Sequence, residues 1–111
     1  MVKDGALVFD GTNRIVTPVE RFAPVTLEGW VWPERYEYRG HCIVGSNVAG
    51  QWGISLSING VLLTAEYIPG EVRSKQSVPV QKWSHLAAVF GEKETRLYFN
   101  GKLVDTGPPT E

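Results

Sequence analysis

The sequence contains a single cysteine, Cys42, so no disulfide bond can form within the chain. It has no apolar run approaching about 18 residues, the length that a membrane-spanning helix needs. A basic segment followed by an apolar one is also missing, so we find no signal peptide in these residues. Eleven basic and twelve acidic side chains give a net charge of −1, and neither sign forms a block, which argues against nucleic acid as a partner.

Two Asn-Gly pairs are the most informative feature that is present. Asn59-Gly60 and Asn100-Gly101 each lie between runs of Leu, Ile, Val, Tyr and Phe. Asparagine and glycine tolerate the positive φ angles of a type I′ turn, whose twist matches that of the flanking strands. The two pairs therefore predict two tight antiparallel hairpins.

Strand patterns account for most of the remaining sequence. Apolar and polar residues alternate from Val25 to Trp32, which predicts a central strand with one set of side chains on each face. The nearly continuous apolar run Trp83 to Phe90 predicts a strand buried on both faces. The other expected strands are Ala6–Phe9, Arg14–Thr17, His41–Gly45, Trp52–Ile58, Val61–Tyr67, Arg73–Val80, Thr95–Phe99 and Lys102–Asp105. With no helix of ordinary length, this pattern indicates an all-β sandwich, jelly roll or barrel of eight to ten short strands.

The segment Trp83-Ser-His-Leu-Ala-Ala-Val-Phe90, followed by Arg96-Leu-Tyr-Phe-Asn-Gly-Lys-Leu-Val104, resembles the signature hairpin of the laminin-G-like, or concanavalin A-like lectin/glucanase, superfamily. Three further blocks are similar to that family and occur in its order: Ala6–Gly11, Val25–Pro33, and Ile43–Ser46 with Trp52–Leu56. The resemblance implies an antiparallel two-sheet jelly-roll sandwich, with residues 1–111 as one domain of a larger protein or a truncated form. It favours an extracytoplasmic location. Because this fold hosts lectins, adhesion domains and glycosidases alike, the resemblance says more about fold than about function.

One departure from the family concerns the C-terminal side. Family members continue past the second hairpin into strands that pair with the opening strand, whereas this sequence stops at Glu111. We therefore expect the usual C-terminal strands to be missing and Ala6–Phe9 to have an unpaired side. An open apolar edge favours a homodimer by strand exchange or edge pairing. The alternative is a compact variant or an excised fragment whose edge is covered.

A small turn after the first block offers a candidate metal site. Asp10, Gly11 and Asn13 form it, and the family resemblance implies that a calcium ion can be held near this rim, with Asp10 and Asn13 as ligands. Calcium takes six to eight oxygen ligands. Because the chain has only three aspartates, carbonyl groups and water would have to supply most of them. The alternative is ordinary turn chemistry, in which Asp10 accepts hydrogen bonds from nearby amides.

Aromatic and charged residues after the Val25–Trp32 strand form the candidate ligand site. We expect Trp32, Tyr36 and Tyr38 to be exposed and to stack against sugar rings, with Arg35 and Arg39 as hydrogen-bonding partners. The alternative is a solvated loop. Three other tryptophans have apolar strand neighbours and are expected in the core: Trp30, Trp52 and Trp83.

Enzymatic function has little support in the sequence. Glycosidases of this jelly-roll class carry a Glu-x-Asp-x-x-Glu strand, and the chain has none. Ser84 and His85 are adjacent on a predicted strand and should point apart, so they cannot form a nucleophile and base pair. Cys42 lies in an apolar run and is expected to be a buried small side chain. We therefore predict a non-catalytic recognition module, with carbohydrate as its leading ligand. The alternative is a protein interaction or self-assembly module that acts through a sheet edge.

Overall fold

The computed structural model describes residues 2–3, 5–10, 12, 14–16, 24–36, 41–45, 54–67 and 70–109. These residues form ten strands and no helix, so they contain no helix long and apolar enough to cross a membrane. The strands are β1 (Val2–Lys3), β2 (Ala6–Leu7), β3 (Val25–Val31), β4 (His41–Gly45), β5 (Ser55–Asn59), β6 (Leu62–Glu66), β7 (Glu71–Ser77), β8 (Ser84–Phe90), β9 (Thr95–Phe99) and β10 (Lys102–Gly107). The all-β prediction is confirmed.

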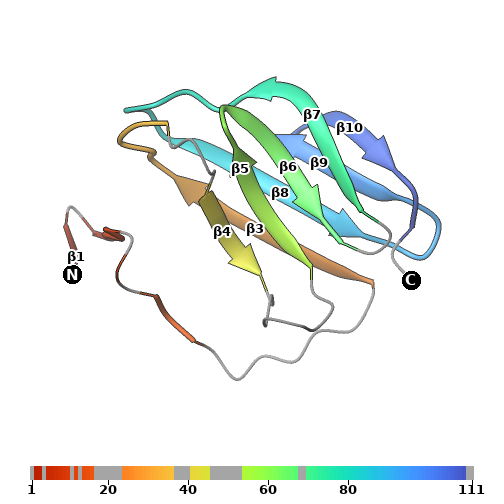
Figure 1. Ribbon diagram of the computed structural model, residues 1–111, viewed down its shortest axis with the longest axis horizontal. Coiled ribbons are helices and arrows are strands. Elements are labelled where there is room, and N and C mark those ends of the chain that lie inside the picture. The colour runs from red at the N-terminus through yellow and green to blue at the C-terminus, as the bar shows by residue number, and fades with distance from the viewer. Residues whose placement is uncertain are drawn as a thin grey trace.

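Two four-stranded antiparallel sheets face each other across one core (Figure 1). Their strand orders are β10-β9-β8-β3 and β4-β5-β6-β7, and β7 and β10 lie side by side where the sheets meet. Both sheets contribute to the core, whose buried members are Ile54, Leu56, Ile58, Leu63, Ala65, Tyr67, Val72, Val78, Leu86, Ala88, Phe90 and Leu97. This arrangement is the two-sheet sandwich of a jelly roll.

The strand β3 shows the predicted alternation but not the predicted position. Its side chains alternate between half-buried and exposed from Val25 to Val31. However, β3 pairs only with β8 among the described strands and forms the edge of its sheet, so the expectation of a central strand is wrong. The alternation of apolar and polar residues indicates which side chains of a strand face the core. It does not indicate whether the strand pairs with one neighbouring strand or with two. The central position belongs to β8, between β3 and β9.

The two Asn-Gly hairpins differ in their turns. Asn100 and Gly101 have φ angles of 48° and 82°, the positive pair that a type I′ turn requires, so this prediction is confirmed. In the other hairpin Asn59 pairs with Leu62, and the two turn residues are Gly60 and Val61, with positive φ at Gly60. This turn therefore lies one residue later than predicted. The observed register sets two buried pairs opposite one another, Leu56 with Ala65 and Ile58 with Leu63, because burial fixes register more strongly than turn preference.

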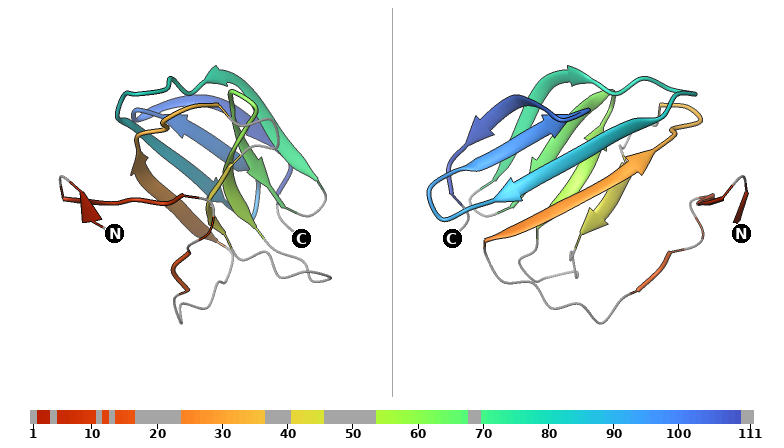
Figure 2. Two further views of the ribbon diagram at one scale, coloured as in Figure 1. Left: turned by 60° about the vertical axis from the view of Figure 1, so that its left-hand side comes forward. Right: turned by 180° about the vertical axis from the view of Figure 1, so that it is seen from behind.

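The N-terminal segment lies apart from the sandwich (Figure 2). Strands β1 and β2 pair with each other around Gly5, whose φ is 79°. Strand structure ends at Leu7 instead of Phe9, and residues 14–16 form no strand, so the predicted strand at Arg14–Thr17 is wrong over its described part. Several large apolar side chains of this segment are exposed: Leu7, Val8, Phe9, Ile15 and Val16.

Candidate functional site

The outward face of the β10-β9-β8-β3 sheet carries a group of aromatic side chains. We call it the outer aromatic face, and the strand register places Trp30, His85 and Tyr98 on it, with the aliphatic Leu103 beside Tyr98. We include Trp32 and Trp83, which are exposed and continue the same alternation just after β3 and just before β8. Trp30 lies opposite His85 in the strand register, and the two rings meet edge to face with centroids 5.3 Å apart. The exposed fractions of Trp30, Trp32 and Trp83 are 65%, 45% and 49%.

The expectation that Trp30 and Trp83 belong to the core is therefore wrong, and Trp52 lies outside the described residues. The error has a simple cause. Trp30 occupies an outward position of β3, between the inward positions of Gly29 and Val31, so apolar sequence neighbours do not place it in the core.

Ser84 and His85 point to opposite sides of β8, as predicted. Ser84 is fully buried between the sheets, whereas His85 lies on the outer face and its Nε2 is 3.2 Å from Glu28 Oε1. This separation rules out a serine–histidine pair at these positions.

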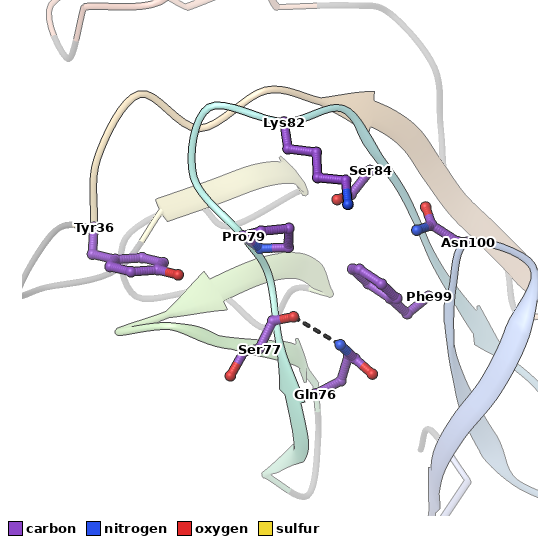
Figure 3. A pocket seen from close by; sticks show the side chains of 8 residues that line it. All are labelled: Tyr36, Gln76, Ser77, Pro79, Lys82, Ser84, Phe99 and Asn100. Atoms are coloured by element: carbon purple, nitrogen blue, oxygen red, sulfur yellow. Dashed lines mark hydrogen bonds between the residues drawn. The ribbon is translucent and has the colours of Figure 1, made fainter.

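A pocket of about 330 Å³ opens at one end of the sandwich (Figure 3). We call it the rim pocket, and it is lined by Tyr36, Gln76, Ser77, Pro79, Lys82, Ser84, Phe99 and Asn100. These residues come from the end of β7, the start of β8, the end of β9 and the adjoining loops. The volume is at the lower end of the range for small-ligand sites, about 300–1,000 Å³. The pocket therefore suits a small ligand group, of the size of one sugar unit.

Backbone hydrogen bonds fix the loops that form this pocket. The amide of Gln81 donates to the carbonyl of Pro33 at 2.6 Å, which joins the loop before β8 to the segment that carries Tyr36. The amide of Val78 donates to the carbonyl of Val61 at 2.8 Å. The pocket walls are thus tied to both sheets of the sandwich.

Several polar groups of the rim pocket have unused hydrogen-bonding capacity. The Oγ atom of Ser84 is buried and has no partner within the described part of the chain. Asn100 accepts a hydrogen bond at Oδ1 from the amide of His85 at 2.8 Å, which leaves its NH₂ group as a donor. Gln76 donates through Nε2 to the carbonyl of Ser77 at 2.8 Å, which leaves Oε1 as an acceptor. The pocket can therefore both donate to and accept from a ligand.

Charge in the rim pocket comes from Lys82. It is the single lysine or arginine among the eight lining residues, and no aspartate or glutamate is among them. Figure 3 shows its side chain extending from the loop toward the space between Pro79 and Asn100. Within the described ranges, no carboxylate lies within ion-pair distance of Lys82.

A laminin G model of the concanavalin A-like lectin/glucanases superfamily matches residues 9–111. The chain belongs to this family. No curated protein sequence matches it. Among solved structures, it is similar to a Bacteroides ovatus protein described as a "putative carbohydrate binding protein", with a TM-score of 0.64 at 14% identity. The match covers 78% of this chain and 26% of the other, so this chain spans about a quarter of that protein's length. At this low identity, the likeness shows the fold alone.

The structure places the predicted ligand residues of this concanavalin A-like chain at different sites. Tyr36 lines the rim pocket and is 46% exposed, whereas Trp32 belongs to the outer aromatic face. Arg35 is exposed and does not line the rim pocket. Tyr38 and Arg39 lie outside the described residues, so their roles stay predictions.

Of the eight described pocket residues, sequence reasoning proposed only Tyr36 as a ligand residue. Among the seven that it missed are three with hydrogen-bond donors, Lys82, Ser84 and Asn100. The sequence indicated only that Asn100 forms a turn. A turn that closes a hairpin also places the side chains of its residues at the rim of a sandwich. Nothing in the linear pattern distinguishes Lys82 from other surface lysines. Its neighbours in the pocket come from β7 and β9 and from the segment before β4.

The structure shows turn chemistry at Asp10. Its Oδ1 accepts hydrogen bonds from the backbone amide and the hydroxyl of Thr12, at 2.8 and 2.6 Å. Asn13 lies outside the described residues, and the described ones contain no group of three or more His, Cys, Asp or Glu side chains that could hold a metal. These residues do not by themselves supply the six to eight oxygens that calcium takes. Calcium binding at Asp10 and Asn13 therefore stays a prediction.

Cys42 is an exposed residue of β4, so the expectation of a buried side chain is wrong. Partial burial nevertheless raises the pKa of its thiol, and the negative charge of Glu66 acts in the same direction. Hydrogen bonds with Ser57 and Ser55 lower the pKa but do not reverse the shift. A raised pKa keeps the thiol protonated at neutral pH, which disfavours a nucleophilic role.

Proposed function

We propose that this chain is a non-catalytic carbohydrate-recognition module and that the rim pocket is its binding site. The observation that carries the proposal is the combination, in one pocket, of an exposed aromatic ring at Tyr36 with polar groups that have unused hydrogen-bonding capacity. Sugars present both kinds of surface, because their C–H faces stack on aromatic rings while their hydroxyl groups donate and accept hydrogen bonds.

The family and its structural neighbour support a role in recognition. The family description includes lectins and glucanases, and the neighbour is described in terms of carbohydrate binding. A glucanase acting by general acid and base needs two carboxyl groups facing the scissile bond. The described residues that line the rim pocket include no aspartate or glutamate, so we propose binding there without hydrolysis.

Two substitutions in the rim pocket test this proposal after a glycan array has identified a bound glycan. Tyr36→Ala should lower the affinity for that glycan about tenfold, because a stacking contact of this kind contributes roughly 0.5–1.5 kcal/mol beyond its buried area. Ser84→Ala should also weaken binding while leaving the free energy of unfolding equal or higher, since it removes a buried hydroxyl without a partner.

Isothermal titration calorimetry measures the affinity of both variants for the glycan. Urea denaturation measures the free energy of unfolding of Ser84→Ala. Val61→Ala is the control, because Val61 is a partly exposed residue of the β5–β6 turn and does not line the rim pocket. Unchanged affinity in both pocket variants, or an array on which no glycan binds, would refute the proposal.

A second candidate function, self-association, is favoured by a different surface. The outward edge of β3 has no strand partner among the described residues, and exposed Trp30 lies on that strand. Phe9, Ile15 and Val16 are exposed side chains of the N-terminal segment, which lies apart from the sandwich (Figure 2). We propose that the N-terminal segment of a second copy adds to the β3 edge and covers Trp30, because open strand edges pair readily with extended apolar segments.

Sedimentation velocity over a wide range of protein concentrations tests this second candidate. The unaltered chain should change from monomer to dimer as its concentration rises. Trp30→Lys should raise the midpoint concentration of that change tenfold or more, since a lysine on an edge strand opposes pairing. Val61→Lys, on the other sheet, should leave it unchanged. A constant monomer mass at all concentrations would eliminate the candidate.

A further inference from the structure

Among the described residues, no carboxylate compensates the positive charge of the rim pocket. Lys82 contributes an ammonium group, the eight lining residues include no carboxylate, and the described residues place none within ion-pair distance of it. Lysines on protein surfaces are commonly solvated and contribute little. Lys82 differs from such a lysine because its side chain extends over a pocket whose walls hold further donors (Figure 3).

Hydrogen-bond donors are gathered at the same end of the pocket. Ser84 has a buried hydroxyl with no partner in the described part of the chain. The side-chain NH₂ of Asn100 is available as a hydrogen-bond donor, because the Oδ1 atom is the one that accepts the hydrogen bond from the amide of His85. Together with Lys82, these groups form a set of donors on the β8 and β9 side of the pocket. An ionised carboxylate accepts several hydrogen bonds and donates none, so it is the ligand group that such a set fits best.

Apolar surface completes the site. Tyr36 and Phe99 present rings at opposite sides of the pocket, and Pro79 lies between them (Figure 3). A small free anion would use the donors and leave these rings uncovered. A sugar ring that carries a carboxylate would use both, with its C–H face on the apolar side and its carboxylate at Lys82.

We infer that the rim pocket is specific for an acidic sugar, a unit of the uronic-acid type whose carboxylate pairs with Lys82. This inference rests on the proposed function and goes beyond it by naming the chemical class of the ligand. Ser84 and Asn100 donate further hydrogen bonds to the same unit, and Tyr36 stacks on its ring.

The test compares two ligands that differ only at the carboxyl group. The probes are a trisaccharide of galacturonic acid and its carboxyl-reduced neutral analogue, and calorimetry measures their affinities for the whole chain at about 20 mM and about 500 mM salt. The unaltered chain should bind the acidic trisaccharide at least tenfold more tightly than the neutral one at low salt. High salt should reduce that preference.

Lys82→Gln should lower affinity for the acidic trisaccharide about tenfold and change affinity for the neutral analogue less than about twofold, because a charge-assisted hydrogen bond is lost only with the acidic ligand. Lys102→Gln is the matched control. Lys102 is an exposed lysine that follows the Asn100-Gly101 turn but does not line the pocket. Circular dichroism should show the same fold for both variants.

Each outcome separates this inference from the proposed function. Equal binding of the acidic and neutral trisaccharides overturns the inference and leaves carbohydrate recognition intact. A preference for the acidic trisaccharide that Lys82→Gln does not reduce also overturns it. If neither trisaccharide binds and the glycan array is likewise negative, the proposed function fails. If only the trisaccharides fail while other glycans on the array bind, the inference alone is refuted.

Discussion

Replacing Phe90 by alanine is expected to lower the free energy of unfolding by about 3–5 kcal/mol, the cost of removing a large aromatic side chain from a filled core. Phe90 is fully buried on the inward face of β8. Its ring meets that of Tyr67, which follows β6 in the opposite sheet, edge to face with centroids 5.7 Å apart. Phe90 therefore joins the two layers of the sandwich.

The magnitude is large for a chain of this size. A stability of roughly 0.05–0.15 kcal/mol per residue is typical, so the loss would remove a substantial part of the total. Urea denaturation followed by tryptophan fluorescence measures it. Val89→Ala is the control, because Val89 directly precedes Phe90 on β8 and lies half-buried on the outer face, where truncation should cost about 1 kcal/mol or less.

If Phe90→Ala does not fold, Phe90→Leu gives a measurable intermediate loss, since leucine refills part of the space. A double-mutant cycle of Tyr67→Leu and Phe90→Leu should give a coupling of about 0.5–1.5 kcal/mol for the ring pair. Equal stability losses in Phe90→Leu and Val89→Ala would contradict the role assigned to Phe90.

Replacing Gly107 by alanine is expected to destabilise the fold by about 1–3 kcal/mol through overpacking. Gly107 ends β10, where that strand lies beside β7. A Cβ atom at this position would lie 2.9 Å from the hydroxyl of Tyr67 and would clash with Cγ2 of Val72. Both neighbours are buried, so neither side chain can move away without disturbing the core.

Alanine also restricts the unfolded chain, an effect that stabilises by about 0.4–1 kcal/mol where the native backbone allows it. We expect the clash to outweigh this gain. The control is Thr106→Ala, at an exposed position of the same strand, which should change stability by less than about 0.5 kcal/mol. Thermal denaturation of the two variants checks the difference, and a Gly107→Ala protein as stable as the unaltered chain would contradict the tight approach of β10 and β7.

The two proposed functions use different surfaces and can be tested independently. Tyr36 belongs to the rim pocket and Trp30 to the outer aromatic face. Tyr36→Ala should weaken glycan binding without changing the sedimentation of the chain. Trp30→Lys should weaken dimerisation, seen by sedimentation, without changing glycan binding. Loss of both properties in either variant would instead indicate one continuous surface.

The strands were largely predictable because their signals are local. The alternation of apolar and polar residues predicted β3, and a continuous apolar run predicted β8. The Asn100-Gly101 pair predicted the turn between β9 and β10. Each signal lies within a few consecutive residues. The prediction for the tryptophans failed where the signal is not local. The apolar neighbours of Trp30 suggested burial, but its outward position on β3 decides its exposure.

The candidate site was predictable only at Tyr36. An aromatic residue in a polar segment that follows a strand is recognisable as exposed. Lys82, Ser84 and Asn100 acquire a common role only through the packing of β7, β8 and β9, which brings residues distant in sequence to one end of the sandwich.

The sequence by itself thus determined an all-β fold, because side-chain periodicity and turn chemistry act over a few residues. The resemblance of four sequence blocks then indicated the two-sheet sandwich of the concanavalin A-like family. The tertiary structure alone decided the edge position of β3 among the described strands, the exposure of Trp30 and Trp83, and the meeting of Tyr36 with Lys82 and Ser84. These depend on which strands become neighbours and how the two sheets stack, and both follow from burying the whole core at once.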